Sequence, residues 1–225
     1  MKTATERPWG SLSWPNRISL LRLLLVAPFI VLLLSQGDDG WPWARHVAIA
    51  IFVVMAVSDM VDGILARRLQ QKTRLGAILD PLADKILIIS SVLVLSQPAK
   101  AVPDAMLPNW VVVAVVGKDL WIVIGFLVVY LVTDKLRAEP SISGKASTMA
   151  QLLMVGFVLV APELDAAAPG LALGKWIVRV LMYAVAVLAA LAVISYTRKG
   201  LRTIAQHQKP LENHRATHDQ PHAPD

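Results

Sequence analysis

Residues 59–84 read DMVDGILARRLQQKTRLGAILDPLAD and place four aspartates within two stretches that are otherwise apolar. On each stretch, aspartates and residues with small side chains recur at helical spacing, which puts them on one face of a helix. The first stripe is Asp59, Asp62, Gly63 and Ala66, and the second is Gly76, Asp80 and Asp84. Because ionisable groups are costly in hydrocarbon, such residues inside apolar segments usually serve a function. The segment therefore predicts two helices, each with one carboxylate-bearing face.

The rest of the chain is also apolar. Of its 225 residues, 56% are hydrophobic and only 17% are charged, whereas soluble proteins average about 45–50% apolar and about 25% charged residues. A bilayer core takes roughly 20 helical residues. The stretches that meet or approach this length are 18–35, 46–69, 76–96, 108–132, 147–163 and 176–196. The composition predicts an all-α integral membrane protein with six transmembrane helices.

The distribution of Lys and Arg predicts how these spans are oriented. Fifteen of them lie in the N-terminal segment, the second and fourth connections and the C-terminal tail, whereas the alternate connections hold only Arg45, Lys100 and Lys175. Cytoplasmic connections are the basic ones, so we expect both termini and the second and fourth connections to be cytoplasmic. The net charge of +6 then reflects topology and attraction to anionic membrane lipids, and predicts no nucleic-acid partner.

Two segments flank the predicted domain at 18–196. Residues 1–17 include Trp9, Leu12 and Trp14, a composition typical of an interfacial segment, although a lead-in without structure is the alternative. Residues 197–225 are polar and are predicted to form a disordered cytoplasmic tail. Cysteine is absent, which excludes disulfides, thiolate metal sites and cysteine nucleophiles.

The four aspartates are predicted to meet in one pocket. Twelve residues separate Asp59 from the outer end of its span, and twelve follow Asp84 back to that side, so at 1.5 Å per residue both lie about 18 Å deep. If the two helices are antiparallel neighbours, all four carboxylates face a pocket on the cytoplasmic side. They cannot all be ionised without cations. Two Mg²⁺ or Mn²⁺ ions, which prefer oxygen ligands, would neutralise them and could clamp a pyrophosphate.

The spacing D-x2-D-G-x2-A-R-x8-G-x3-D-x3-D in residues 59–84 resembles the signature of the CDP-alcohol phosphatidyltransferases, with all eight fixed positions matched. The resemblance extends over about residues 8–198. It implies that Asp59, Asp62 and Asp80 bind the two metal ions. It also implies that Asp84 is the general base for the acceptor hydroxyl, and contributes to the metal site as well. The residues that it assigns to the CDP moiety are Asp62, Gly63, Ala66, Arg67 and Gly76.

The resemblance also implies the reaction. The deprotonated acceptor attacks the β-phosphorus of CDP-diacylglycerol, the phosphatidyl group is transferred and CMP leaves. The family further implies a homodimer and an active site at the cytoplasmic face of the cell membrane. Arg67 would offset charge on the phosphates, although a basic residue in a cytoplasmic connection also serves as a topology anchor.

Residues 15–28 resemble the start of the branch that contains phosphatidylglycerophosphate synthases and bacterial-type cardiolipin synthases. In this reading Asn16 contributes to CDP binding and Arg22 meets a phosphate. The alternatives are that Asn16 caps a helix and that Arg22 extends its charged end toward the membrane surface.

Two lysines are further candidates for binding a phosphate on the acceptor. Lys145 stands in a stretch, 140–151, that resembles the same branch, but it can also be a topology charge. Lys118 interrupts the apolar fourth span together with Asp119. Adjacent helical residues point about 100° apart, so these two side chains need not pair. The branch often has an arginine at the position of Lys118, and a lysine lacks the bidentate geometry with which arginine binds phosphate.

The anionic acceptor that these residues favour is glycerol 3-phosphate, followed by phosphatidylglycerol, as in cardiolipin synthase, and then inositol phosphate. A rival of another class is an ion- or proton-coupled transporter, because intramembrane charges can form a relay. Transporters usually show inverted repeats or broken helices, and the sequence shows neither. An inactive membrane scaffold is a third alternative, and the complete signature argues against it.

Overall fold

The computed structural model describes residues 14–36, 41, 43–69, 74–133 and 142–218, and describes side chains outside 14–19, 59–81 and 207–218. These parts contain six α-helices, a short 3₁₀ turn at Pro98–Lys100 and no strand. The helices are α1 Trp14–Leu34, α2 Ala44–Leu69, α3 Arg74–Leu95, α4 Asn109–Thr133, α5 Ile142–Ala167 and α6 Leu173–His218. The prediction of an all-α fold is confirmed for the described residues.

Each helix contains one of the apolar stretches identified in the sequence, to within one residue at its ends. Within the described residues, three segments are long and apolar enough to cross a membrane: Asn109–Thr133, Ile142–Ala167 and Leu173–Gln206. Leu20–Leu34 and Ala44–Ser58 form shorter apolar helices. Helix α1 begins at Trp14, so the end of the predicted interfacial segment is helical, while residues 1–13 lie outside the described residues. Six membrane spans remain a prediction.

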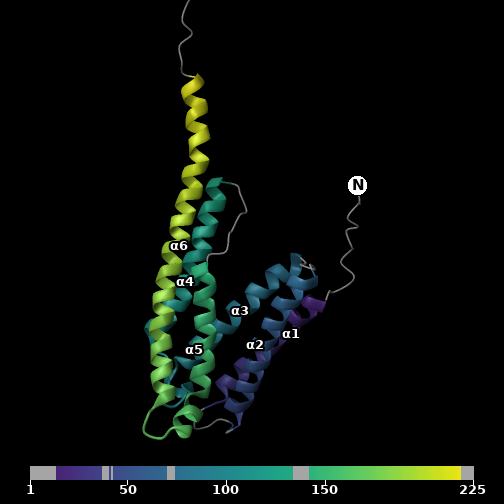
Figure 1. The fold of residues 1–225 in the computed structure, drawn as a ribbon, viewed down its shortest axis with the longest axis vertical. Helices are drawn as coiled ribbons and strands as arrows, with labels where there is room; N and C mark the ends of the chain where they lie inside the picture. The colour runs from purple at the N-terminus through teal and green to yellow at the C-terminus, as the bar shows by residue number, and fades with distance from the viewer. Residues whose placement is uncertain (1–13, 37–40, 42, 70–73, 134–141, 219–225) are drawn as a thin grey trace, which may run out of the picture.

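The helices form two groups that α3 connects. Helix α1 packs against both α2 and α3, and α6 packs against α4 and α5, and Figure 1 shows the first group inclined to the second. Contacts of α3 with α4 and α5, and of α2 with α5, join the groups. Buried apolar side chains such as Phe29, Met55, Ile88 and Met154 fill the interior. Helix α3 therefore contacts helices of both groups.

Helix α6 continues well beyond its apolar part and projects past the other helices (Figure 1). The prediction that the chain is disordered from residue 197 is therefore wrong as far as His218, while residues 219–225 lie outside the described residues. Nucleation is the costly step of helix formation, so an existing helix is extended at little cost. Leu201, Arg202 and Ala205 are good helix formers that allow this extension.

A close approach of backbones joins the start of α6 to α5. The Gly174 amide donates a hydrogen bond to Asp165 Oδ1 at 2.6 Å. A Cβ atom at Gly174 would lie only 2.8 Å from the Cα of Ala161 and would also meet its carbonyl oxygen. Backbone atoms cannot rotate away as a flexible side chain can. Glycine is thus required here for the α5–α6 hairpin to close.

We expect Gly174→Ala to lower the free energy of unfolding by about 1–3 kcal/mol, the usual range for overpacking. The measurement is thermal unfolding of the purified protein in detergent. Gly125→Ala in α4 is the matched control, because a Cβ there would meet nothing within 4 Å and alanine favours helix by about 1 kcal/mol. Equal melting temperatures for the two variants would contradict the close approach.

Candidate functional site

The two stripes of the aspartate motif lie on consecutive helices. Helix α2 carries Asp59, Asp62, Gly63, Ala66 and Arg67, and α3 carries Gly76, Asp80 and Asp84. Both stretches are continuous α-helix, so the i, i+3, i+4 and i+7 spacing does put the members of each stripe on one helix face. Among the residues of the two stripes, Asp84 is the one whose side chain the structure describes. A common pocket for all four carboxylates remains a prediction.

Asp84 is paired with Arg22 of α1. The Arg22 side chain is 1% exposed, and its Nη1 lies 3.4 Å from Oδ1 of Asp84, which is 25% exposed. Arg22 therefore does not extend to the membrane surface, the alternative considered from the sequence, but points into the interior beside the predicted catalytic base. The pairing offsets part of the cost of burying a guanidinium. It also gives Asp84 a defined orientation while leaving part of its carboxylate accessible.

A second charged cluster joins α3, α4 and α5. Lys118 and Asp119 of α4 are both buried, with Lys118 Nζ 2.8 Å from Asp119 Oδ1. Lys85 of α3 contacts the same carboxylate oxygen through its Nζ. Lys118 Nζ also donates a hydrogen bond to Gln151 Oε1 of α5 at 3.4 Å. The two adjacent residues of α4 thus do pair, because the long lysine side chain spans the angle between them.

This cluster, Lys85–Asp119–Lys118, contains two ammonium groups and one carboxylate, so it carries excess positive charge. Beside it, Gln151 and Ser147 are fully buried, and within the described residues Gln151 Nε2 and Ser147 Oγ have no hydrogen-bond partner. Buried polar groups are normally paired. Cations and unpaired donors at one place fit a site for an anionic, oxygen-rich ligand.

The two clusters meet on α3, because Asp84 and Lys85 are adjacent residues. A carboxylate that can accept a proton and one cation of the cluster are therefore carried by consecutive residues of α3. Sequence reasoning had not identified Gln151 and Ser147 as site residues. Their i, i+4 spacing on α5 was the available signal, since it puts two polar side chains on one face of an apolar helix.

Two other candidate binding residues from the sequence are Lys145 and Asn16. Lys145 lies near the start of α5 and is exposed, about 9 Å along the helix from Gln151 at 1.5 Å per residue. Asn16 lies in the first turn of α1, and its side chain is outside the described set. For both residues the alternatives considered from the sequence stay open.

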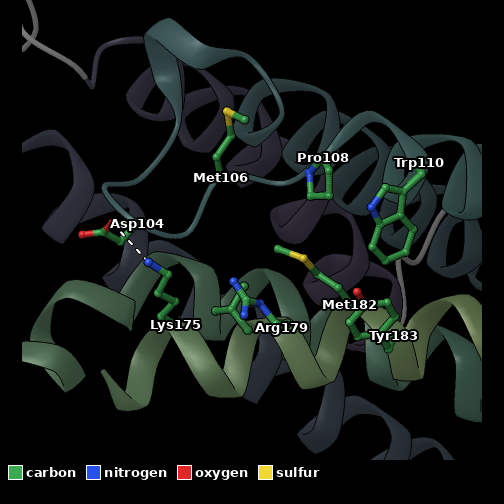
Figure 2. A pocket seen from close by; sticks show the side chains of 9 residues that line it. Asp104, Met106, Pro108, Trp110, Lys175, Arg179, Met182 and Tyr183 are labelled. Carbon is green, nitrogen blue, oxygen red and sulfur yellow. Dashed lines mark ion pairs between the residues drawn. The ribbon is translucent and has the colours of Figure 1, made fainter. Parts of the chain in front are cut away.

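Two cavities lie away from these clusters. One, of about 220 Å³, is formed by the α3–α4 connection and the starts of α4 and α6 (Figure 2). The other, of about 210 Å³, is an apolar groove between α2 and α5, where Phe52 faces Gly156. Neither is lined by Asp84 or Lys118.

Comparison with known proteins agrees with the motif. The sequence profile of the CDP-alcohol phosphatidyltransferase family matches residues 12–192. A Bacillus subtilis protein named CDP-diacylglycerol–glycerol-3-phosphate 3-phosphatidyltransferase is 31% identical over 154 residues, which cover 65% of this chain and 76% of the relative. A Mycobacterium tuberculosis protein named "Probable phosphatidylglycerophosphate synthase" is 34% identical over 192 residues, 84% of this chain and 82% of the relative.

A third relative, from Mycobacterium bovis, is named "Putative cardiolipin synthase" and is 35% identical over 147 residues, 65% of this chain and 63% of the relative. The family match covers most of the chain, including α1, all of the aspartate motif on α2 and α3, and the cationic cluster that joins α3 to α4 and α5. This protein therefore belongs to the CDP-alcohol phosphatidyltransferase family.

Proposed function

We propose that this protein transfers the phosphatidyl group of CDP-diacylglycerol to glycerol 3-phosphate, releasing CMP and forming phosphatidylglycerophosphate. The observation that carries the acceptor assignment is the adjacency of Asp84 to the Lys85–Asp119–Lys118 cluster on α3. Glycerol 3-phosphate has a hydroxyl and a phosphate on one short backbone, so its site needs a base and a cation close together. The names of the Bacillus subtilis and Mycobacterium tuberculosis relatives support the same reaction.

In this proposal each part of the site has one task. Asp84 accepts the proton of the acceptor hydroxyl at its carboxylate, with Arg22 orienting it. The small residues of the stripes, Gly63, Ala66 and Gly76, leave room for the CDP moiety, and Arg67 offsets its phosphate charge. Lys118, Gln151 and Ser147 bind the acceptor's phosphate, with Lys145 nearer the entrance.

The donor set of the motif fits a pair of divalent cations. Four carboxylates on the stripes of two consecutive helices offer only hard oxygen ligands, which Mg²⁺ and Mn²⁺ prefer, and the family is generally dependent on divalent metals. We propose that Asp59, Asp62 and Asp80 hold two such ions, with Asp84 contributing. When bound, the ions supply positive charge that stabilises the transferring phosphoryl group and the leaving CMP.

The membrane arrangement completes the proposal. All six helices would span the bilayer with both termini and the aspartate site on the cytoplasmic side, as the basic connections predict, in the cell membrane. The protein would act as a homodimer, in line with its family. The polar headgroup of CDP-diacylglycerol would then stay at the cytoplasmic face while its acyl chains remain in lipid.

The direct test is CMP release by the purified protein with CDP-diacylglycerol and Mg²⁺ or Mn²⁺. Glycerol 3-phosphate, phosphatidylglycerol and inositol phosphate are offered in parallel. We expect release with glycerol 3-phosphate. Release only with phosphatidylglycerol would instead establish cardiolipin synthesis, the second candidate, which the Mycobacterium bovis relative's name favours. A transporter or an inactive scaffold would release no CMP with any acceptor.

The metal assignment predicts how two variants behave. Asp59→Ala and Asp80→Ala should each raise the Mg²⁺ concentration for half-maximal CMP release by about tenfold or more and lower the maximal rate, because each removes an oxygen ligand. The measurement is a Mg²⁺ titration of CMP release. Asp104→Ala is the control, since Asp104 lies in the α3–α4 connection and its side chain is exposed. An unchanged Mg²⁺ requirement in both aspartate variants would contradict the assignment.

A further inference from the structure

The cavity of about 220 Å³ lies where α4 and α6 begin, away from the aspartate motif (Figure 2). Asp84 is eleven residues before the end of α3 at Leu95, about 16 Å along the helix, whereas the cavity is formed beyond that end. Its lining includes Asp104, Met106 and Pro108 of the α3–α4 connection, Trp110 of α4, and Lys175, Arg179, Met182 and Tyr183 of α6.

The cavity carries an excess of positive charge. Lys175 and Arg179 are four residues apart, on one face of α6. Lys175 has an exposed partner, Asp104, whose carboxylate is 3.8 Å away. The Arg179 guanidinium lies over the Trp176 ring at 5.3 Å, and in the described parts of the chain no carboxylate pairs with it within 4.0 Å. Two cations and one distant carboxylate suit a monovalent anion.

The next turn of α6 is aromatic and apolar. Tyr183, four residues after Arg179, stacks on Trp110 with ring centroids 5.5 Å apart and an interplanar angle of 22°. Val178 and Met182, which also line the cavity, are buried. Trp and Tyr are enriched where a membrane protein crosses from headgroups to hydrocarbon. Along α6 the lining thus changes from cationic at Lys175 and Arg179 to aromatic at Tyr183, with the apolar side chains of Val178 and Met182 beside these residues.

A cationic end for a phosphate and an aromatic end flanked by apolar side chains match the headgroup and the upper acyl region of a phospholipid. From Lys175 to Tyr183 the stripe rises about 12 Å at 1.5 Å per residue. The interfacial layer on each side of a bilayer is only about 5–8 Å thick. A stripe of that length that begins among the headgroups therefore reaches the hydrocarbon, so a phosphate and the first part of an acyl chain can be bound together.

We propose that this cavity binds one anionic phospholipid, with its phosphate at Arg179 and Lys175 and an acyl chain along Trp110, Tyr183 and Met182. The occupant is an anionic lipid rather than a zwitterionic one. The headgroup of a zwitterionic lipid carries a positive charge, which the Arg179 guanidinium would repel. The site is separate from the transfer reaction. It would give the protein a resident lipid in the leaflet at this end of the helices.

The test is native mass spectrometry of the full-length protein in detergent with phosphatidylglycerol, phosphatidylcholine or inorganic phosphate. We expect the protein to retain phosphatidylglycerol at lipid concentrations that leave no phosphatidylcholine bound. Lys175→Gln/Arg179→Gln should weaken phosphatidylglycerol binding by about tenfold or more. Met106→Trp, at an exposed residue of the rim, should weaken it similarly by filling the cavity without changing its charge.

Lys199→Gln/Arg202→Gln is the matched control, because it removes the same charges from exposed positions that follow the apolar part of α6, far from the cavity, and should retain phosphatidylglycerol. Equal loss in the control would show general surface attraction and overturn the proposal. Unchanged retention in Lys175→Gln/Arg179→Gln would do the same, as would binding of inorganic phosphate as tight as that of the lipid. CMP release is expected to survive in the cavity variants. A failure of the lipid-binding proposal can therefore be distinguished from a failure of the proposed function.

Discussion

The Asp84→Asn variant is expected to release CMP about 10²–10⁴-fold more slowly than the unmodified protein while still binding CDP-diacylglycerol. An amide of the same shape cannot accept the proton of the acceptor hydroxyl, and general base catalysis contributes about this factor. The measurements are the CMP release rate at saturating acceptor and binding of CDP-diacylglycerol by calorimetry. A turnover near that of the unmodified protein would remove Asp84 as the base.

A second variant separates chemistry from folding. Asp84→Asn leaves the buried guanidinium of Arg22 beside a neutral amide, and removal of one partner of a buried ion pair is destabilising. Arg22→Gln/Asp84→Asn removes both charges. We expect its melting temperature to exceed that of Asp84→Asn while CMP release stays low. Recovery of CMP release along with stability would show that Asp84 has only a structural role.

The second large effect is expected at Asp119. Asp119→Asn leaves Lys118, whose side chain is 2% exposed, without the carboxylate that it and Lys85 share. Breaking a buried pair on one side typically costs about 3–5 kcal/mol. Thermal unfolding in detergent should show this loss, and the contacts that join α3 to α4 should weaken with it. Lys85→Gln should cost less, because the Lys85 side chain is 38% exposed.

A double substitution again distinguishes two roles. Lys118→Met/Asp119→Leu replaces the pair by apolar side chains of similar size, which is often neutral or stabilising for a buried pair. We expect this variant to regain stability but to need a much higher glycerol 3-phosphate concentration for half-maximal CMP release, with the requirement for CDP-diacylglycerol unchanged. A normal glycerol 3-phosphate requirement would show that Lys118 serves the fold and not the acceptor.

Properties that depend on neighbouring residues in the chain were predictable from the sequence. Each predicted apolar stretch corresponds to one helix to within one residue at its ends, because apolar length and helical spacing are local properties. The aspartate stripes on α2 and α3 are on continuous helices for the same reason. The motif identified the family because its positions and spacing are fixed along the chain, and the profile match over residues 12–192 confirms it.

The sequence could not predict which charged side chains meet across helices. It left Arg22 open between the membrane surface and the interior, and only packing of α1 on α3 places it beside Asp84. The end of α6 was also predicted wrongly, because polar composition does not stop a helix that the preceding span has already nucleated.

By itself, then, the sequence determined the helical membrane class, the aspartate motif and the family, since these follow from local composition, periodicity and spacing. Only the tertiary structure decided that Asp119 joins Lys118 to Lys85, that Ser147 and Gln151 lie beside them, and that Lys175, Arg179 and the Trp110–Tyr183 pair form one cavity. The physical reason is that these groups come from helices far apart in the chain, so their distances depend on how whole helices pack rather than on any local pattern.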